Sequence, residues 1–152
     1  MRRIIFLAIV ALHAVVLAGS LLWAHQGHEH ATGVVKERME LMESMAKAQK
    51  AITQRLRQNR ELELIKVEAR SIRELSEKIP SLFPPGSREH PTAAKEAVWQ
   101  KWSDFEAKAR ATQAESEKLS ATDTRDINAL TAQARALSQS CGTCHELYRA
   151  KK

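Results

Sequence analysis

The chain has 152 residues, of which 24 are Lys or Arg and 18 are Asp or Glu, so its formal net charge is +6 at pH 7. This length fits one domain with a single core, and the scarcity of Gly, Pro and aromatic residues favours helices. Because the charges are interspersed and no basic stripe carries interleaved aromatic residues, we expect a solvated surface of mixed charge and no nucleic-acid partner.

The chain opens with a targeting segment, in which Arg2 and Arg3 precede an apolar run from Ile4 to Trp23. This pattern predicts a secretory signal peptide over residues 1–24, so the rest of the chain is expected to be exported, with a bacterial periplasm as its location. An uncleaved N-terminal anchor is the alternative, because an apolar run of 20 residues is long enough to span a bilayer.

A short polar segment, residues 25–33, follows the leader and contains His25, His28 and His30. We interpret it as a flexible arm. Its histidines could bind copper, zinc or nickel weakly, although a segment left beside the cleavage site is the simpler interpretation.

Four later segments place apolar residues at steps of three and four, which is the pattern of helices that each bury one face. Asn59 marks a turn between the first two segments, and three prolines and a glycine between residues 80 and 86 separate the second from the third. The third segment opens at Pro91 or Thr92. The predicted helices cover residues 34–56, 60–79, 92–119 and 124–150.

These four segments predict an all-α fold over residues 34–152, in which short connections make an antiparallel, up-down-up-down four-helix bundle. Small residues on the last helix, such as Ala134 and Ser138, would leave room between the helices for a group that is not a side chain.

The only two cysteines, Cys141 and Cys144, lie in the sequence CGTCH, directly before His145. A thioredoxin-like dithiol is not expected, because no strand pattern is visible, and a structural zinc site lacks a second cysteine pair. The Cys-x-x-Cys-His spacing predicts one haem c, attached covalently through two thioethers, with His145 as the proximal iron ligand. Both cysteines continue the apolar face of the last helix, so the porphyrin is expected to enter the bundle there.

The sequence resembles the cytochrome c prime family of class II c-type cytochromes in four stretches: VVKERMELM, LFPPGS, AVWQKWSDF and CGTCHELYRAKK. The resemblance covers residues 33–152 and implies a four-helix bundle with one covalent haem near its C-terminus, often as a homodimer. Family members with an apolar distal residue leave the iron five-coordinate and can bind NO or CO, whereas members with a distal methionine carry electrons.

The resemblance also implies where the sixth iron ligand lies. In the family the distal residue follows an arginine of the first helix by four positions, and Arg38 is here followed by Met42. Met39 and Met45 lie three residues to either side and are alternatives, as is an open distal face. Methionine is also a common filler of irregular cores.

Further haem contacts are implied for Arg38 and Trp99. The family arginine lies near a haem propionate, and a guanidinium suits a carboxylate by geometry; an ordinary surface charge is the alternative. Trp99 falls at the family's tryptophan position. With Phe83 and Trp102 it is a candidate for lining the haem pocket, although aromatic residues on a helix stripe are commonly plain core.

Taken together, these features predict a periplasmic monohaem c-type cytochrome that carries single electrons through a six-coordinate, low-spin His/Met iron. The alternative is a five-coordinate, high-spin cytochrome that binds NO or CO. Nothing in the sequence suggests an enzyme. The expected partners are redox proteins and a second copy in a homodimer, and a membrane would be involved only if the leader stayed uncleaved.

Overall fold

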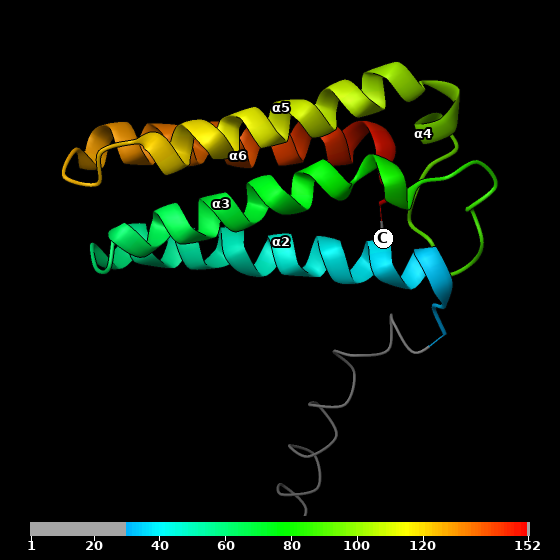
Figure 1. The fold of residues 1–152 in the computed structure, drawn as a ribbon, viewed down its shortest axis with the longest axis horizontal. Coiled ribbons are helices and arrows are strands. Elements are labelled where there is room, and N and C mark those ends of the chain that lie inside the picture. Colours follow the sequence, from blue (N-terminus) through cyan, green and yellow to red (C-terminus); the bar gives the residue numbers. More distant parts are fainter. Residues whose placement is uncertain (1–29, 152) are drawn as a thin grey trace, which may run out of the picture. The chain divides into compact units, whose positions relative to one another are not determined.

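The computed structural model describes residues 30–151, and the bundle is the compact unit that begins at Thr32. This part of the chain contains four long helices. Figure 1 shows that they run alternately in opposite directions, which confirms the predicted antiparallel four-helix bundle. Two short helices lie in the connection between α3 and α5. The long helices are α2 (Gly33–Gln58), α3 (Glu63–Lys78), α5 (Trp102–Ala121) and α6 (Ile127–Tyr148), and the short ones are η1 (Pro80–Leu82) and α4 (Ala97–Gln100).

The predicted leader, residues 1–24, lies outside the described residues, as do His25 and His28. Within residues 30–151, no helix is long and apolar enough to cross a membrane. His30 is exposed, and no group of three or more His, Cys, Asp and Glu side chains in the described part of the chain could hold a metal ion. Metal binding by the histidine arm therefore stays a prediction. The helix α2 begins at Gly33, one residue before its predicted start.

Local capping explains where two of the helices end and begin. Asn59 has φ 47° and ψ 45°, a left-handed conformation that asparagine tolerates, and its N–H donates to the carbonyls of Arg55 and Leu56 to close α2. Asp126 opens α6, because its carboxylate accepts hydrogen bonds from the N–H groups of Asn128 (3.1 Å) and Ala129 (2.9 Å). The predicted turn at Asn59 is confirmed, but α3 begins only at Glu63 instead of residue 60.

The predicted start of the third long helix at residues 91–92 is wrong. The chain there pairs with the end of α6: the Lys95 N–H donates to the Tyr148 carbonyl (2.9 Å), and the Ala150 N–H donates to the Ala93 carbonyl (2.8 Å). This pairing holds residues 93–95 out of a helix and ends α6 at Tyr148 instead of residue 150. Lys101, with φ −121° and ψ 46°, then separates α4 from α5.

All four long helices contribute to the core through the predicted stripes. Ser76 and Ser116 are also fully buried, and each satisfies its hydroxyl by donating to the carbonyl four residues earlier in its own helix, at 2.6 and 2.7 Å. The largest fully buried apolar side chains are Ile52, Ile65, Ile72, Val98, Leu119, Leu130 and Leu137.

Candidate functional site

A cavity of about 510 Å³ lies inside the bundle and is lined by side chains from all four long helices. Its size is within the roughly 300–1,000 Å³ of typical ligand and cofactor sites. α2 lines it from Met42 to Arg57, because residues three and four apart share one helix face. The other walls are Ile72 and Ile79 from α3 and the residue after it, Phe105, Ala109 and Thr112 from α5, and Cys141, Cys144 and His145 from α6.

The three residues of the CGTCH motif face this cavity together. Cys141, Cys144 and His145 lie on one side of the last turns of α6, where positions i, i+3 and i+4 are neighbours. Both cysteines are half-buried free thiols. Burial raises the pKa of Cys141, and burial together with the neighbouring Cys141 raises the pKa of Cys144 to about 11. Both thiols are therefore protonated at neutral pH in the folded chain.

His145 lies between the cavity and the outside of α6. Its outer side lines a second hollow of about 470 Å³ beside Glu146, Arg149 and Lys151. Burial, and then the positive charge of Arg149, lower the pKa of His145 below its ordinary value. Both effects favour the neutral imidazole, which is the form that binds metals.

The structure separates the three candidate methionines. Met42 and Met45 line the cavity from α2, facing the α6 residues, whereas Met39 does not line it. Met45 is buried at 8% exposure and packs in the core, and Met42 is partly buried against it. The candidates from this helix that share a cavity with His145 are thus Met42 and Met45.

Arg38 is neither a surface charge nor part of the cavity lining. Its side chain is 4% exposed and holds the loop after α3 through hydrogen bonds from all three guanidinium nitrogens. Nε and Nη2 both donate to the Leu82 carbonyl, and Nη2 also donates to the carbonyl and the hydroxyl of Ser87. Nη1 donates to Thr92 Oγ1. The guanidinium carbon lies 4.0 Å from the ring centroid of Phe83.

The guanidinium of Arg38 has no carboxylate partner within ion-pair distance among residues 30–151, and burial lowers its pKa. Its Nη1 makes one hydrogen bond in this part of the chain and so keeps one N–H for a further acceptor. The predicted propionate contact therefore stays a prediction, while the organisation of the loop is observed.

The aromatic residues form a cluster behind the cavity. Trp99 donates from Nε1 to the carbonyls of Phe83 (3.1 Å) and Pro84 (3.0 Å), and neither Trp99, Phe83 nor Trp102 lines the cavity. Phe105, which the sequence analysis did not single out for the site, lines it and packs edge-on against Phe83 with ring centroids 4.8 Å apart. The predicted pocket aromatics thus support the wall instead of forming it.

Tyr148 closes the cluster from α6. Its ring packs against Phe105 with centroids 5.3 Å apart, and its hydroxyl donates to Asp104 Oδ2 at 2.5 Å. Burial, and then this hydrogen bond, raise the pKa of Tyr148 to about 12. The bond joins α5 to the turn of α6 that carries His145.

The room in the cavity comes from small residues other than those predicted. Ala134 is buried in the core and Ser138 is exposed, and neither lines the cavity. The small lining residues, apart from the two cysteines, are Ala46, Thr53, Ala109 and Thr112. Lys50 and Arg57 also line the cavity and were not predicted to do so; their spacing of seven residues, after Met42 and Met45 on the same helix, was the available signal.

The lining fits a haem c. Two thiols and one imidazole in the attachment spacing meet a cavity whose remaining wall is mostly apolar, and a thioether lies on the facing helix. Cys141 and Cys144 would hold the porphyrin, and His145 would bind its iron.

Comparisons with known proteins agree with this fold and motif. A family model described as cytochrome c′ matches residues 33–149. Cytochrome c-556 of Agrobacterium tumefaciens is 37% identical over 90 residues, which are 59% of this chain and 73% of that protein. Cytochrome c-554 of Cereibacter sphaeroides is 36% identical over 75 residues, 47% of this chain and 49% of that protein, so the chain matches about half of that relative's length. Among solved structures, the nitric oxide complex of a variant cytochrome c′ from Alcaligenes xylosoxidans aligns with a TM-score of 0.70 and 29% identity over 78% of this chain and 94% of that chain.

Proposed function

Because this chain belongs to the cytochrome c′ family, we propose that it is a periplasmic electron carrier and not an enzyme. One haem c would be held through thioethers to Cys141 and Cys144, and His145 would bind its iron; all three residues line the cavity. When bound, the haem supplies a ferric/ferrous couple that exchanges one electron. Export, and with it the periplasmic location, rests on the leader-like sequence of residues 1–24.

We assign Met42 as the second axial ligand. The observation that carries this assignment is that Met42 and His145 line the same cavity from facing helices. A Met/His pair raises the reduction potential, and a saturated iron changes little between its two oxidation states, which suits electron transfer. Ile72, Phe105 and Ala109 give the same cavity an apolar lining, which would favour ferrous over ferric haem because the ferrous form carries less charge.

A matched pair of substitutions tests the assignment, because both methionines line the cavity and leucine conserves their volume. Met42→Leu should convert a low-spin absorption spectrum to a high-spin one, allow the ferrous protein to bind CO, and lower the potential by on the order of 0.1 V, a fraction of the roughly 0.8 V that axial ligation spans. Met45→Leu should leave the spectrum low-spin. If instead Met45→Leu opened the iron and Met42→Leu did not, Met45 would be the ligand.

The second candidate function is binding of NO or CO at a five-coordinate iron. The observation that favours it is the similarity to a cytochrome c′ variant whose structure was solved as a nitric oxide complex. A CO titration of the wild-type ferrous protein separates the two functions. Rapid CO binding, preceded by a high-spin spectrum, would replace the electron-carrier proposal with this one.

A further inference from the structure

The basic residues of the bundle are unevenly distributed along the sequence. Residues 44–60, the second half of α2 and the turn after it, contain no acidic residue but five basic ones. Residues 127–145, most of α6, contain no acidic residue and one basic one, Arg135. The five basic residues of the first segment are Lys47, Lys50, Arg55, Arg57 and Arg60.

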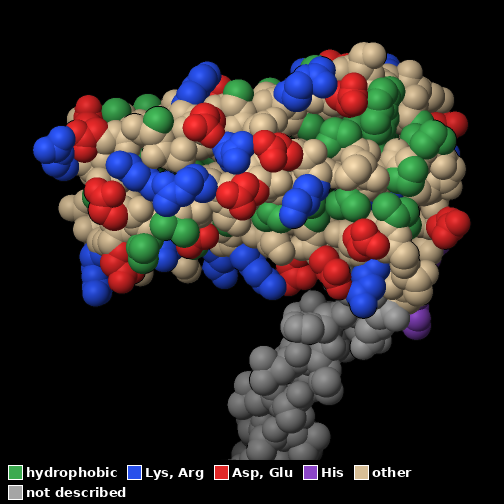
Figure 2. Space-filling view, in the orientation of Figure 1, with side chains coloured by type: hydrophobic (Ala, Val, Ile, Leu, Met, Phe, Trp, Pro, Cys, Tyr) green, Lys and Arg blue, Asp and Glu red, His purple; other side chains and the backbone are tan. Residues whose placement is uncertain are grey.

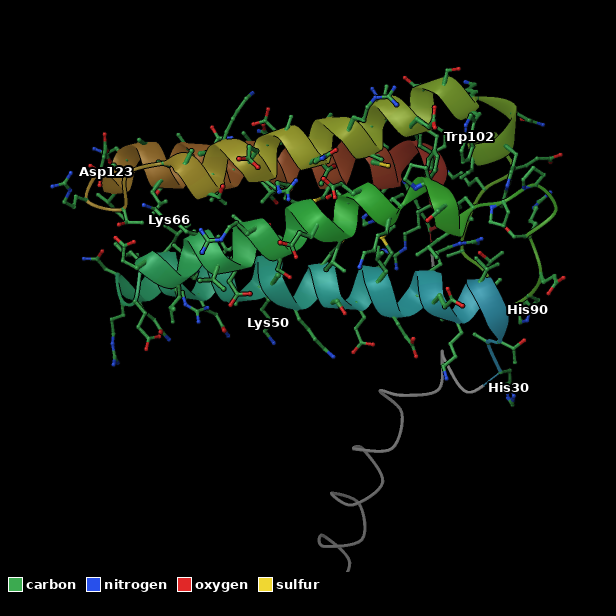
Figure 3. All side chains as sticks on the ribbon, in the orientation of Figure 1. His30, Lys50, Lys66, His90, Trp102 and Asp123 are labelled. Carbon is green, nitrogen blue, oxygen red and sulfur yellow. The ribbon has the colours of Figure 1, made fainter. Side chains whose placement is uncertain are left out.

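The fold brings these two segments to the cavity, because α2 and α6 supply its facing walls. Lys50 and Arg57 line the cavity and are exposed, so their charged groups lie at its rim, and Figure 3 places Lys50 on α2. Neither has an ion-pair partner among residues 30–151. The neighbouring Lys47, by contrast, pairs with Glu43 at 2.8 Å.

The α3–α5 side of the bundle has a different charge pattern. α3 carries four acidic and four basic residues, and α5 carries four acidic and three basic ones. They pair with one another, as Arg73 does with Glu77 (2.7 Å) and Glu117 (3.3 Å), and Arg110 with Glu106 (3.8 Å). On the face shown in Figure 2, Lys and Arg side chains alternate with Asp and Glu. The expected surface of mixed charge describes this side, whereas the rim of the cavity is cationic.

We propose that the α2–α6 rim, defined by the exposed, cavity-lining residues Lys50 and Arg57, is the docking surface for a protein partner whose own redox centre lies under an acidic surface. The proposal rests on the proposed function, since it places the partner beside the wall of the haem cavity. Unpaired charges of one sign at the rim attract the opposite charge over about a Debye length, and so orient the partner before contact. Gln54, which lines the same wall and is exposed, adds a polar side chain without acidic repulsion.

The test uses the full haem-loaded chain and a plant-type [2Fe–2S] ferredoxin as an acidic protein probe. Binding is measured by titrating the protein into isotope-labelled oxidised ferredoxin and following its amide shifts. The dissociation constant should rise steeply between about 10 and about 300 mM salt, because the Debye length shortens over that range. At low salt, Lys50→Glu with Arg57→Glu should weaken binding about tenfold or more, in line with the contribution of close charge pairs.

The matched control is Arg70→Glu with Arg110→Glu, which changes the net charge equally but lies on exposed positions of α3 and α5. It should alter the dissociation constant by less than about threefold, because charges far from the contact act only through screened long-range terms. Equal weakening by both double variants would overturn the proposal, since net charge alone would then explain it. Binding without salt dependence would overturn it as well.

Two further measurements keep the alternatives apart. The first is sedimentation of the wild type with phosphatidylglycerol vesicles. If the Lys50→Glu, Arg57→Glu variant lost vesicle binding but kept ferredoxin binding, the rim would be a lipid-binding surface and the proposal would fail. The titration does not depend on axial ligation or electron transfer. A high-spin spectrum or an absent electron-transfer rate would therefore contradict the proposed function while leaving the docking result decisive.

Discussion

The loop between α3 and α4 depends on one buried cation, and we predict that Arg38→Met destabilises the fold strongly. Arg38 is 4% exposed and is the hydrogen-bond donor recorded for the Leu82 and Ser87 carbonyls within residues 30–151. Ser87 Oγ also donates to the Pro84 carbonyl, and Thr92 Oγ1 accepts from the Ala94 N–H, so those two side chains keep a partner when Arg38 is lost.

The magnitude follows from the two carbonyls. A buried polar group left without a partner costs about 1–3 kcal/mol, so two such groups cost about 2–6 kcal/mol. Methionine retains the packing of the arginine stem against Phe83, and partial access of water lowers the cost, so we expect a loss of about 3 kcal/mol. Arg38→Lys keeps the charge but cannot fork between Leu82 and Ser87, so it should lose about half as much.

The assay is urea unfolding of the haem-loaded protein, followed by far-UV circular dichroism and by haem absorbance. Arg73→Met is the matched control: its ion pairs join partly exposed side chains, so the loss should stay within about 1 kcal/mol. An Arg38→Met protein within that same limit would refute the reasoning. If it also showed a shifted reduction potential, the main role of Arg38 would be the propionate contact implied by the family resemblance.

Two further predictions concern the connection between α5 and α6. Asp126→Ala should lower the free energy of unfolding by about 1 kcal/mol, because it removes the carboxylate that caps the Asn128 and Ala129 N–H groups. Asp126→Asn keeps a capping oxygen and should lose much less stability in the same urea assay. Equal losses by the two variants would contradict the capping role. Asp123→Asn should flatten the acid side of a profile of unfolding free energy against pH. Hydrogen bonds from Arg125 lower the pKa of Asp123 to about 2, so the stabilisation by this carboxylate is complete above its ordinary pKa near 4 and is lost as the pH falls towards 2. An unchanged profile between these pH values would contradict this role of Asp123.

Local pattern was sufficient to predict the four long helices, because each buries a stripe of its own residues. It was not sufficient for the start of the third one. Pro91 and Thr92 are good helix-opening residues, yet residues 93–95 bond to Tyr148 and Ala150, which are far away in sequence. A long-range backbone pairing of this kind leaves no periodic signal in the segment where the error arose.

In the candidate site, too, some features could be predicted from the sequence and others depended on contacts between distant segments. The spacing of Cys141, Cys144 and His145 was enough to place them on one helix face. Met42 was predicted from the family resemblance and not from spacing, and it lines the same cavity from α2. The acceptors of Arg38 could not be foreseen, because they are backbone carbonyls brought there by the loop. The absence of acidic residues from residues 44–60 was visible in the sequence, but its meaning depends on which helices face the cavity.

The order in which the walls of the cavity are made has a consequence for how the protein matures. One wall belongs to the first helix of the bundle and the opposite wall to the last, so the enclosure is completed only when the end of the chain docks. Until then Cys141 and Cys144 are ordinary accessible thiols, whereas docking suppresses the thiolate form on which their reactivity depends. We therefore expect porphyrin attachment to precede closure of the bundle, while the chain is still open.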